Sequence, residues 1–251
     1  MQQEGMVSIV TPVYNAAGYI EDTIRSVLSQ TYAGWEWILV DDRSGDESAS
    51  IIEKYLSDER IRLIKQDKNS GAANSRNEGI RQARGRYLAF LDADDIWLPQ
   101  KLEKQLAFIK EKEAAFTYTA YEFGDEKAKP TGNLVKVMPE LKYRKALSRT
   151  IVFTTTVMFD LNLIPKDKVM MKSIPSEDTA TWWRIMREGY TAYGLDEVLA
   201  IYRRPESSLS SNKVSAIKRI WNLYRKEENL GIVSSAFYFV FWALRATIRR
   251  L

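Results

Sequence analysis

The sequence predicts an α/β fold, in which a largely parallel sheet carries helices on both faces. Two observations carry this prediction. Over residues 1–110, short apolar runs alternate with segments whose apolar residues recur at helical spacing, and the links between them are short. Polar clusters then follow three of the apolar runs, which is where parallel sheets bind their ligands.

The first half is predicted to contain four strand–helix pairs. Each strand is a short run of β-branched or aromatic residues, and the predicted strands are residues 7–10, 35–40, 61–64 and 87–91. The helices follow from apolar residues three or four apart, from a polar turn or from Pro99 at a helix start, and cover residues 20–28, 51–56, 71–83 and 100–111.

The second half is less regular and predicts a mixed sheet followed by helices. Strands are expected at residues 116–123 and 151–159, with two short strands within 190–202 and a loop at 124–132. A helix follows Glu177-Asp178 and stops at Gly189. A polar linker ends at residue 212, which divides the chain into a sheet domain, 1–212, and a helical tail, 213–251.

The composition excludes several kinds of chemistry. The 251 residues contain no cysteine and no histidine. A disulfide, a Cys or His zinc site, a Ser-His-Asp triad and a thiolate nucleophile are therefore impossible. A metal would need oxygen ligands, which favours Mg²⁺ or Mn²⁺, and a general base would be Asp or Glu.

Positive charge is concentrated in the tail. Residues 216–251 contain seven Lys or Arg and two Glu, whereas the whole chain carries a net charge of only +4. This distribution argues against a nucleic-acid binder. Neither a signal peptide nor a membrane-spanning helix is expected. The tail is predicted either to lie in a membrane interface, with aromatic residues at headgroup depth, or to pack as a helical pair on protein.

Asp92 and Asp94 end the fourth predicted strand. Residues i and i+2 of a strand point to the same side, so both carboxylates would converge on a small volume. Their repulsion favours a bound cation, and a magnesium-class ion completes its shell with substrate phosphates. The alternative is a solvated acidic turn that caps the next helix.

Asp41-Asp42 ends the second predicted strand. Such carboxylates can accept a hydrogen bond from a base or a ribose, and Thr11 and Tyr14 could add a hydroxyl and a flat surface. For each of them a turn or cap role is the alternative. Arg76 could clamp a diphosphate or lie on a solvated helix face. Glycine-rich dinucleotide and P-loop motifs are absent.

Glu177-Asp178 opens the helix that contains Trp182. One helical turn separates Asp178 from Trp182, so a carboxylate and an aromatic plate would share a face. This pair could take a proton from a sugar hydroxyl and stack on the sugar ring. The alternative, which we favour from spacing alone, is an N-cap followed by a core tryptophan.

The order of these motifs resembles the family 2 glycosyltransferases over residues 6–210. The matching segments are Thr11-Pro12-Val13-Tyr14-Asn15, Val40-Asp41-Asp42-Arg43-Ser44, Asn69-Ser70-Gly71 with Arg76-Asn77, Phe90-Leu91-Asp92-Ala93-Asp94-Asp95 and Glu177-Asp178 with Trp183-Arg184. The stretch from Ser176 to Asn212 is most similar to bacterial cell-surface polysaccharide enzymes such as the teichuronic acid glycosyltransferases.

The resemblance implies a GT-A fold, a nucleotide-diphosphate sugar donor and inversion at the anomeric carbon. It implies a role for each matching residue: Thr11, Pro12, Tyr14, Asn15, Asp41 and Asp42 around the base, Arg76 at the base or diphosphate, Asp92 and Ala93 at the ribose, Asp94 on Mn²⁺ or Mg²⁺, and Asp178 as catalytic base. Possible acceptor or phosphate contacts are Glu177, Trp182, Arg203 and Arg204. Many relatives have a histidine near the position of Pro205, and this chain lacks it.

The sequence thus predicts an inverting, metal-dependent glycosyltransferase of cell-surface polysaccharide synthesis, peripheral on the cytoplasmic face of the membrane. The donor is expected to be a UDP-sugar and the acceptor a glycan or a lipid-linked saccharide. A sugar-nucleotide nucleotidyltransferase is one alternative, although residues 11–18 lack its glycine-rich basic loop. An inactive scaffold subunit of a polysaccharide-assembly complex is the other.

Overall fold

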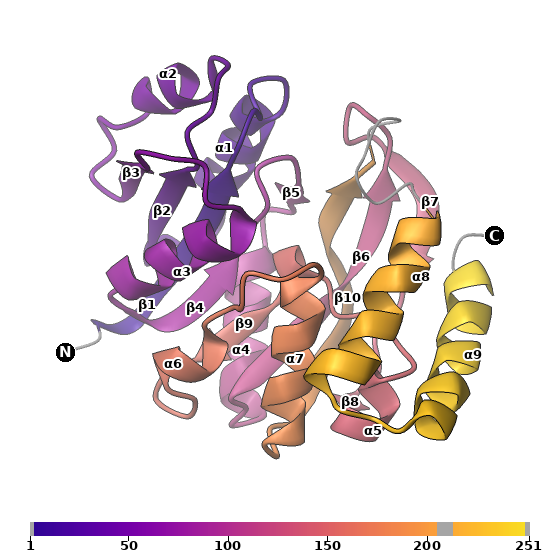
Figure 1. Ribbon diagram of the computed structural model, residues 1–251. Helices are drawn as coiled ribbons and strands as arrows, with labels where there is room; N and C mark the ends of the chain where they lie inside the picture. The colour runs from indigo at the N-terminus through magenta and orange to yellow at the C-terminus, as the bar shows by residue number, and fades with distance from the viewer. Residues whose placement is uncertain (1–2, 205–212, 249–251) are drawn as a thin grey trace.

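A computed structural model describes residues 3–204 and 213–248, and its strands confirm the predicted α/β class (Figure 1). The strands are β1 (Gln3–Val13), β2 (Trp35–Asp41), β3 (Ile61–Lys65), β4 (Gly85–Phe90), β5 (Ile96–Trp97), β6 (Phe116–Gly124), β7 (Pro130–Val135), β8 (Glu140–Leu141), β9 (Met158–Asp160) and β10 (Ala192–Arg203). In the described residues they form a ten-stranded sheet of order β3-β2-β1-β4-β9-β6-β10-β5, with β7 on β6 and β8 on β10.

Helices cover both faces of this sheet. They are α1 (Ile20–Leu28), α2 (Ser48–Glu53), α3 (Ala72–Gln82), α4 (Lys101–Glu111), α5 (Tyr143–Ala146), α6 (Lys166–Val169), α7 (Glu177–Arg187), α8 (Lys213–Asn222) and α9 (Ile232–Ile248). A 3₁₀ turn, Thr154–Thr156, precedes β9, and a π-helical stretch, Leu223–Glu227, follows α8.

The first half of the sheet is parallel, as predicted. β1 pairs in parallel with β2 and β4, and β2 pairs in parallel with β3. The register brings Val13 beside Asp41 and Val10 beside Phe90, so the polar segments that follow these strands meet at one edge. Helix α3 packs directly on β1, because a Cβ at Gly79 would overlap the Val10 side chain.

The second half differs from the predictions in detail. Within the stretch predicted as a strand, 151–159, only Met158 and Phe159 pair, as part of β9, which continues to Asp160 and is antiparallel to both β4 and β6. Residues 192–203 form one strand, where two short strands were predicted. Its register on β6 shifts after Leu195 and after Val198, but its pairing with β6 continues on both sides of these shifts. The loop predicted at 124–132 is shorter, since β7 begins at Pro130.

The first tail helix belongs to the same hydrophobic core as the sheet. Ile220, Leu223 and Tyr224 are buried, and the Tyr224 ring stacks on Trp183 with centroids 5.3 Å apart. The packed-helix alternative therefore holds for α8. The polar linker predicted at 207–212 lies outside the described residues. Within the described ranges, no helix combines the length and the apolar character needed to cross a bilayer.

Lys101, near the start of α4, is an unusual core residue. It is fully buried, and its Nζ has no hydrogen-bond partner among the described residues. The ammonium lies 3.7 Å from the centroid of the Trp97 ring, an arrangement that favours the charged form. Burial acts in the opposite direction, and it holds the pKa of Lys101 well below its usual value because lost hydration outweighs a single ring face.

We predict that Lys101→Met raises the free energy of unfolding at neutral pH by roughly 1–3 kcal/mol, the usual cost of a buried unsatisfied polar group. The native pKa is depressed, so unfolding takes up a proton below about pH 10.4, and the wild type loses stability as the pH falls toward the native pKa. The advantage of the variant should grow over that window. Urea unfolding at a series of pH values measures it.

The matched control is Lys110→Met on the exposed side of the same helix, which should change stability by less than about 0.5 kcal/mol. A Lys101→Met protein that is less stable than the wild type would mean that Trp97 holds a charged ammonium.

Candidate active site

The loops after β1 and β2 are joined to each other by hydrogen bonds. Asn15 accepts a bond from the Gly45 N–H (2.8 Å), and its own N–H donates to the Ser44 hydroxyl (3.0 Å). The backbone conformations of Asn15 and Arg43 are left-handed, with φ of 49° and 60°, which costs energy for residues other than glycine. These contacts hold Tyr14, which is 54% exposed, at the sheet edge with its ring free for a ligand.

Asp42 ties the β2 loop to the loop before α3. Its buried carboxylate accepts bonds from the N–H groups of Ser70 (2.8 Å) and Gly71 (2.7 Å), which explains the spacing of these two motifs. Asp41 accepts from the Ser44 N–H. Thr11 is a correction to the predicted site: it is fully buried beneath the edge, and its hydroxyl accepts a bond from Trp37 Nε1 (2.9 Å), so it offers no surface hydroxyl to a base.

Arg76, on α3, bridges two acidic segments that lie far apart in the sequence. Its Nη2 donates to Asp92 (2.6 Å) and its Nη1 to Glu177 (2.7 Å), and its side chain is 7% exposed. Its Nε is buried without a partner among the described residues. Burial lowers its pKa, but the charges of Asp92, Glu177 and Asp178 raise it further, so the net pKa lies above the usual value. A diphosphate would meet this guanidinium already held by two carboxylates.

Asp94 lies beside Asp92 at the end of β4. Burial and the neighbouring Asp92 charge raise the pKa of Asp94 to about 6. Arg76 neutralises Asp92, whereas Asp94 makes no ion pair with a described residue. Ala93, between them, is buried, and its carbonyl accepts a bond from the Thr23 hydroxyl (2.9 Å). This backbone contact fixes the turn that presents both carboxylates.

Asp95 and Thr155 hold this turn in place, and no sequence motif predicted a role for either of them. Asp95 is fully buried and accepts bonds from the Thr155 hydroxyl (2.5 Å) and the Arg203 N–H (3.0 Å). Burial and the charges of Asp94 and Asp92 raise its pKa well above the usual value. Thr155 also lies 3.2 Å from the Asp92 N–H, which donates to its hydroxyl. The only sequence signal was the fourth residue of the Asp92–Asp95 motif.

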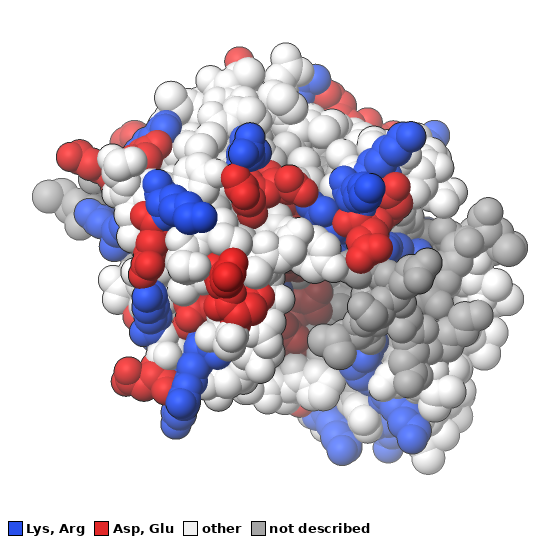
Figure 2. Space-filling view, turned by 90° about the horizontal axis from the view of Figure 1, so that it is seen from above, with Lys and Arg blue, Asp and Glu red and all other residues white. Residues whose placement is uncertain are grey.

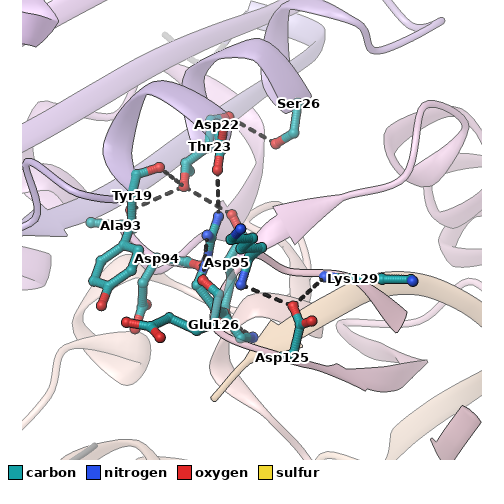
Figure 3. A network of polar contacts seen from close by, with 12 residues as sticks. Tyr19, Asp22, Thr23, Ser26, Ala93, Asp94, Asp95, Asp125, Glu126 and Lys129 are labelled. Carbon is teal, nitrogen blue, oxygen red and sulfur yellow. Dashed lines mark hydrogen bonds and ion pairs between the residues drawn. The ribbon is translucent and has the colours of Figure 1, made fainter. Parts of the chain in front are cut away.

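The structure corrects the prediction that Arg203 contacts phosphate. Its guanidinium is 2% exposed and donates to the Asp94 carbonyl (2.7 Å), the Glu126 carbonyl (2.9 Å) and the Asp22 carboxylate (3.0 Å). Figure 3 shows Asp22, Asp94 and Glu126 arranged around this contact. All its donors point into protein, so Arg203 braces the acidic turn. Arg204 instead lies over the Phe123 ring, 4.2 Å from its centroid, and Pro205 falls outside the described residues.

Asp178 lies in the first turn of α7, where Ser176 precedes the helix in a left-handed conformation (φ 61°). One carboxylate oxygen accepts a bond from the Thr154 hydroxyl (3.1 Å), and the other from the Thr179 N–H (2.6 Å). The positive end of a helix dipole stabilises a negative charge at this position. These contacts hold the carboxylate in a fixed orientation, and the neighbouring Glu177 pairs with Arg76.

Trp182 is a third correction, because it belongs to the core rather than to a sugar-binding surface. It is 1% exposed and packs against Phe90, Phe116 and Phe159. Asp178 and Trp182 do share a helix, but the turn between them crosses from the site into the core. The favoured alternative, a core tryptophan, is therefore what the structure contains.

A hollow that contains acidic side chains opens on one face of the molecule (Figure 2). Figure 2, seen from above, shows red side chains at the floor of this hollow. Within residues 3–204 and 213–248, no three acidic side chains converge as a complete protein metal site. Asp92 and Asp94 nevertheless fit a hard cation that takes its remaining ligands from a diphosphate, because the Asp92 charge acts on Asp94 and only Asp92 has an ion-pair partner among the described residues.

Comparison with known proteins identifies the family. The family model for glycosyl transferase family 2 matches residues 8–162. The putative teichuronic acid biosynthesis glycosyltransferase TuaG of Bacillus subtilis is 42% identical over 248 residues, 98% of each chain. The UDP-Glc:alpha-D-GlcNAc-diphosphoundecaprenol beta-1,3-glucosyltransferase WfgD of Escherichia coli is 35% identical over 219 residues, 87% of this chain and 85% of the relative.

Solved structures show the same fold. S. aureus TarS 1–349 in complex with UDP-GlcNAc superposes with a TM-score of 0.72 at 20% identity, over 97% of this chain and 72% of that one. The mannosyltransferase PcManGT from Pyrobaculum calidifontis, in complex with GDP-Man and Mn²⁺, superposes with a TM-score of 0.73 at 18% identity, over 93% and 69%. The fold is therefore the GT-A fold of these enzymes, and the chain belongs to glycosyl transferase family 2.

Proposed function

We propose that this protein is an inverting, metal-dependent glycosyltransferase that moves a sugar from a UDP-sugar to a hydroxyl of a lipid-linked saccharide. The main observation in support is that Arg76 joins the acidic turn after β4 to the first turn of α7 through two ion pairs. A cation-binding pair of carboxylates and a separately oriented carboxylate thus meet at one hollow. The names of the two relatives, one of teichuronic acid biosynthesis and one that acts on a diphosphoundecaprenol-linked saccharide, support a place in surface-polysaccharide synthesis. The cytoplasmic face of the membrane is part of the proposal.

The donor nucleotide is assigned to the loops after β1 and β2. Tyr14 offers an exposed ring, and Pro12, Asn15, Asp41 and Asp42 build the edge around it. Asp92 and Ala93, which begin the acidic turn after β4, are assigned to the ribose. Asp94, together with Asp92, would hold Mn²⁺ or Mg²⁺, which supplies Lewis-acid stabilisation of the negative charge on the departing diphosphate.

Asp178 is assigned as the catalytic base. Its carboxylate would take the proton of the acceptor hydroxyl while the hydroxyl oxygen bonds to the anomeric carbon and the bond from that carbon to the diphosphate breaks. The bonds from Thr154 and Thr179 orient the carboxylate, which lowers the entropy cost of the transfer. Attack opposite the leaving group inverts the anomeric carbon. Glu177 holds Arg76, and Arg204 remains a candidate for contact with phosphate or acceptor.

Two alternative functions predict different results in binding and activity experiments. A nucleotidyltransferase would bind a nucleoside triphosphate and release pyrophosphate when given a sugar phosphate. An inactive scaffold subunit would bind no nucleotide. The accessible Tyr14 ring and the unpaired Asp94 carboxylate favour a working donor site over both.

Calorimetric titration should show that UDP binds more tightly with Mn²⁺ than with EDTA, and more tightly than GDP or ADP. Asp94→Asn should abolish the metal dependence and weaken binding with Mn²⁺ by about tenfold, which is about 1.4 kcal/mol. Asn keeps the size of Asp94 but removes the charge that attracts a cation. Preference for GDP would change the donor, and no binding of any nucleotide would favour the scaffold.

Asp178→Asn should reduce the rate of sugar transfer by roughly 10²–10⁴-fold, the usual contribution of a general base, because an amide cannot take the proton. UDP affinity should remain unchanged, since the contacts of Asp178 are with Thr154 and Thr179. The readout is a radiolabelled transfer assay beside calorimetry. Asp167→Asn, an exposed acid in the first turn of α6, is the matched control. Near-normal turnover by Asp178→Asn would refute the base assignment.

Arg76→Met should lower the free energy of unfolding by about 1–3 kcal/mol, because it removes the charged partner of the partly buried Asp92 and Glu177 carboxylates. Adding Glu177→Gln should restore part of this loss. Arg81→Met, an exposed arginine on the same helix, should cost less than about 1 kcal/mol. Urea unfolding measures all three variants. Equal effects at positions 76 and 81 would show that the bridge carries no stability.

A further inference from the structure

A second site lies away from the acidic hollow, between the last helix and the middle of the chain. A cavity of about 240 Å³ opens between α9, the end of β7 and residues 148–151. Three cationic side chains line it, Lys136, Arg149 and Arg245, together with the flat ring of Trp242. None of the functional roles assigned above uses this cavity.

The cationic charges of this cavity are uncompensated within the described residues. Arg245 donates to the Ser148 hydroxyl (2.7 Å), which is neutral, and none of the three makes an ion pair with a described carboxylate. Burial and the nearby Arg245 charge lower the pKa of Arg149, and the opposing effect of the Tyr118 phenol is smaller. Two partly buried guanidinium groups side by side are costly unless an anion joins them. The missing partner is therefore expected to be an anionic ligand.

The helix that forms one wall of the cavity also carries an unpartnered apolar stripe. Val233, Phe237, Val240 and Leu244 follow a spacing of four, three and four residues, and each is more than half exposed. The opposite side of α9 packs on the protein through Tyr238, Phe239 and Trp242. Arg245 is the only charged residue between Ile232 and Ile248. Figure 1 places α9 at the outer side of the molecule, beside α8. An aqueous surface gives such a stripe nothing to bind.

The cavity is linked to the candidate base by a short stretch of chain. Thr150 receives a hydrogen bond from Trp242 at the cavity wall (3.2 Å), and Thr154 donates the bond that orients Asp178. Four residues separate them, so their Cα atoms are at most about 14 Å apart. One sugar and the diphosphate that follows it can cover such a span.

We propose that this cavity binds the phosphate of a lipid-linked saccharide acceptor at the membrane surface, while the apolar stripe of α9 enters the lipid beside it. The proposal rests on the proposed glycosyl transfer and names the acceptor site that the transfer needs. Charge complementarity selects the occupant: an anion for the three cations, attached to an apolar chain that continues along the exposed stripe. A soluble glycan would leave both features without a partner.

Co-sedimentation with lipid vesicles tests this inference. The vesicles contain phosphatidylcholine alone, phosphatidylcholine with phosphatidylglycerol, or phosphatidylcholine with a polyprenyl diphosphate. The wild type should bind the third kind most tightly. Arg149→Gln should lose about tenfold of that affinity, because it removes the cation of a charge-assisted contact with the phosphate. Lys136→Gln, on an exposed side chain, is an independent second variant.

Two further variants complete the design. Arg144→Gln removes the same charge from an exposed position on α5 and should bind as the wild type does. Phe237→Ser combined with Leu244→Ser should weaken binding to all three kinds of vesicle. In transfer assays, Arg149→Gln should raise KM for a lipid-linked acceptor and leave KM for the donor unchanged.

The outcomes separate this inference from the proposed function. Failure of the wild type to bind UDP defeats the proposed function. If the wild type binds UDP, two results defeat the acceptor site alone. One is that Arg149→Gln binds vesicles as tightly as Arg144→Gln, and the other is that the wild type binds no vesicle. Equal gains from phosphatidylglycerol and polyprenyl diphosphate also overturn it, because the cavity would then sense only the charge of the surface.

Discussion

Repulsion among carboxylates at one edge of the sheet is the constraint that the surrounding structure answers. Asp92, Asp94 and Asp95 end one strand, and Glu177 brings Asp178 to the same place from α7. Two buried arginines make this possible. Arg76 pairs with Asp92 and Glu177, and Arg203 binds the Asp94 carbonyl and the Asp22 carboxylate. A forked, permanently charged guanidinium can hold two such partners at fixed angles, which a lysine ammonium cannot.

The two arginines do not neutralise the Asp94 carboxylate. Asp94 lies between them with a raised pKa and no ion pair to a described residue. Its backbone is fixed from several sides, by Thr23 at the Ala93 carbonyl and by Arg203 at its own carbonyl. The carboxylate therefore has a defined position without a neutralising partner. This combination suits a residue that meets a cation only when a donor arrives, since the donor phosphates supply the remaining ligands.

The parallel half of the fold was predictable because β2 and β4 are buried along most of their length and are largely apolar. The region around Thr154–Thr156 was not. Its β-branched residues favour a strand, but the hydroxyls of Thr154 and Thr155 bond to Asp178 and Asp95, and these tertiary contacts impose a 3₁₀ turn. The functional pairs Arg76–Asp92 and Arg76–Glu177 likewise have no local signal, since only the folded chain brings them together.

For single side chains, the sequence indicated the kind of chemistry that a residue can perform more often than the role that it has in the folded protein. A tryptophan one turn after an acid has the same spacing whether it faces a sugar or the core, and burial against Phe90 and Phe116 decides for Trp182. An arginine near an acidic turn can bind phosphate or brace the turn. For Arg203 the decision comes from Glu126 and Asp22, on loop and helix segments that the sequence does not relate to it.

The contacts of the acidic turn join residues far apart in the sequence, so they become possible at different times during synthesis of the chain. Arg76 is made before Asp92, so the first ion pair can form as soon as the parallel half leaves the ribosome. Glu177 follows Arg76 by 101 residues, and Arg203 follows Asp94 by 109. At about 5–20 residues per second, this last brace appears roughly 5–20 s after the turn that it holds. A nascent chain therefore lacks the Arg203 contacts with the acidic turn until almost all of the sheet has been synthesised. Among the described strands, it is the last one in the sequence, β10, that completes the site.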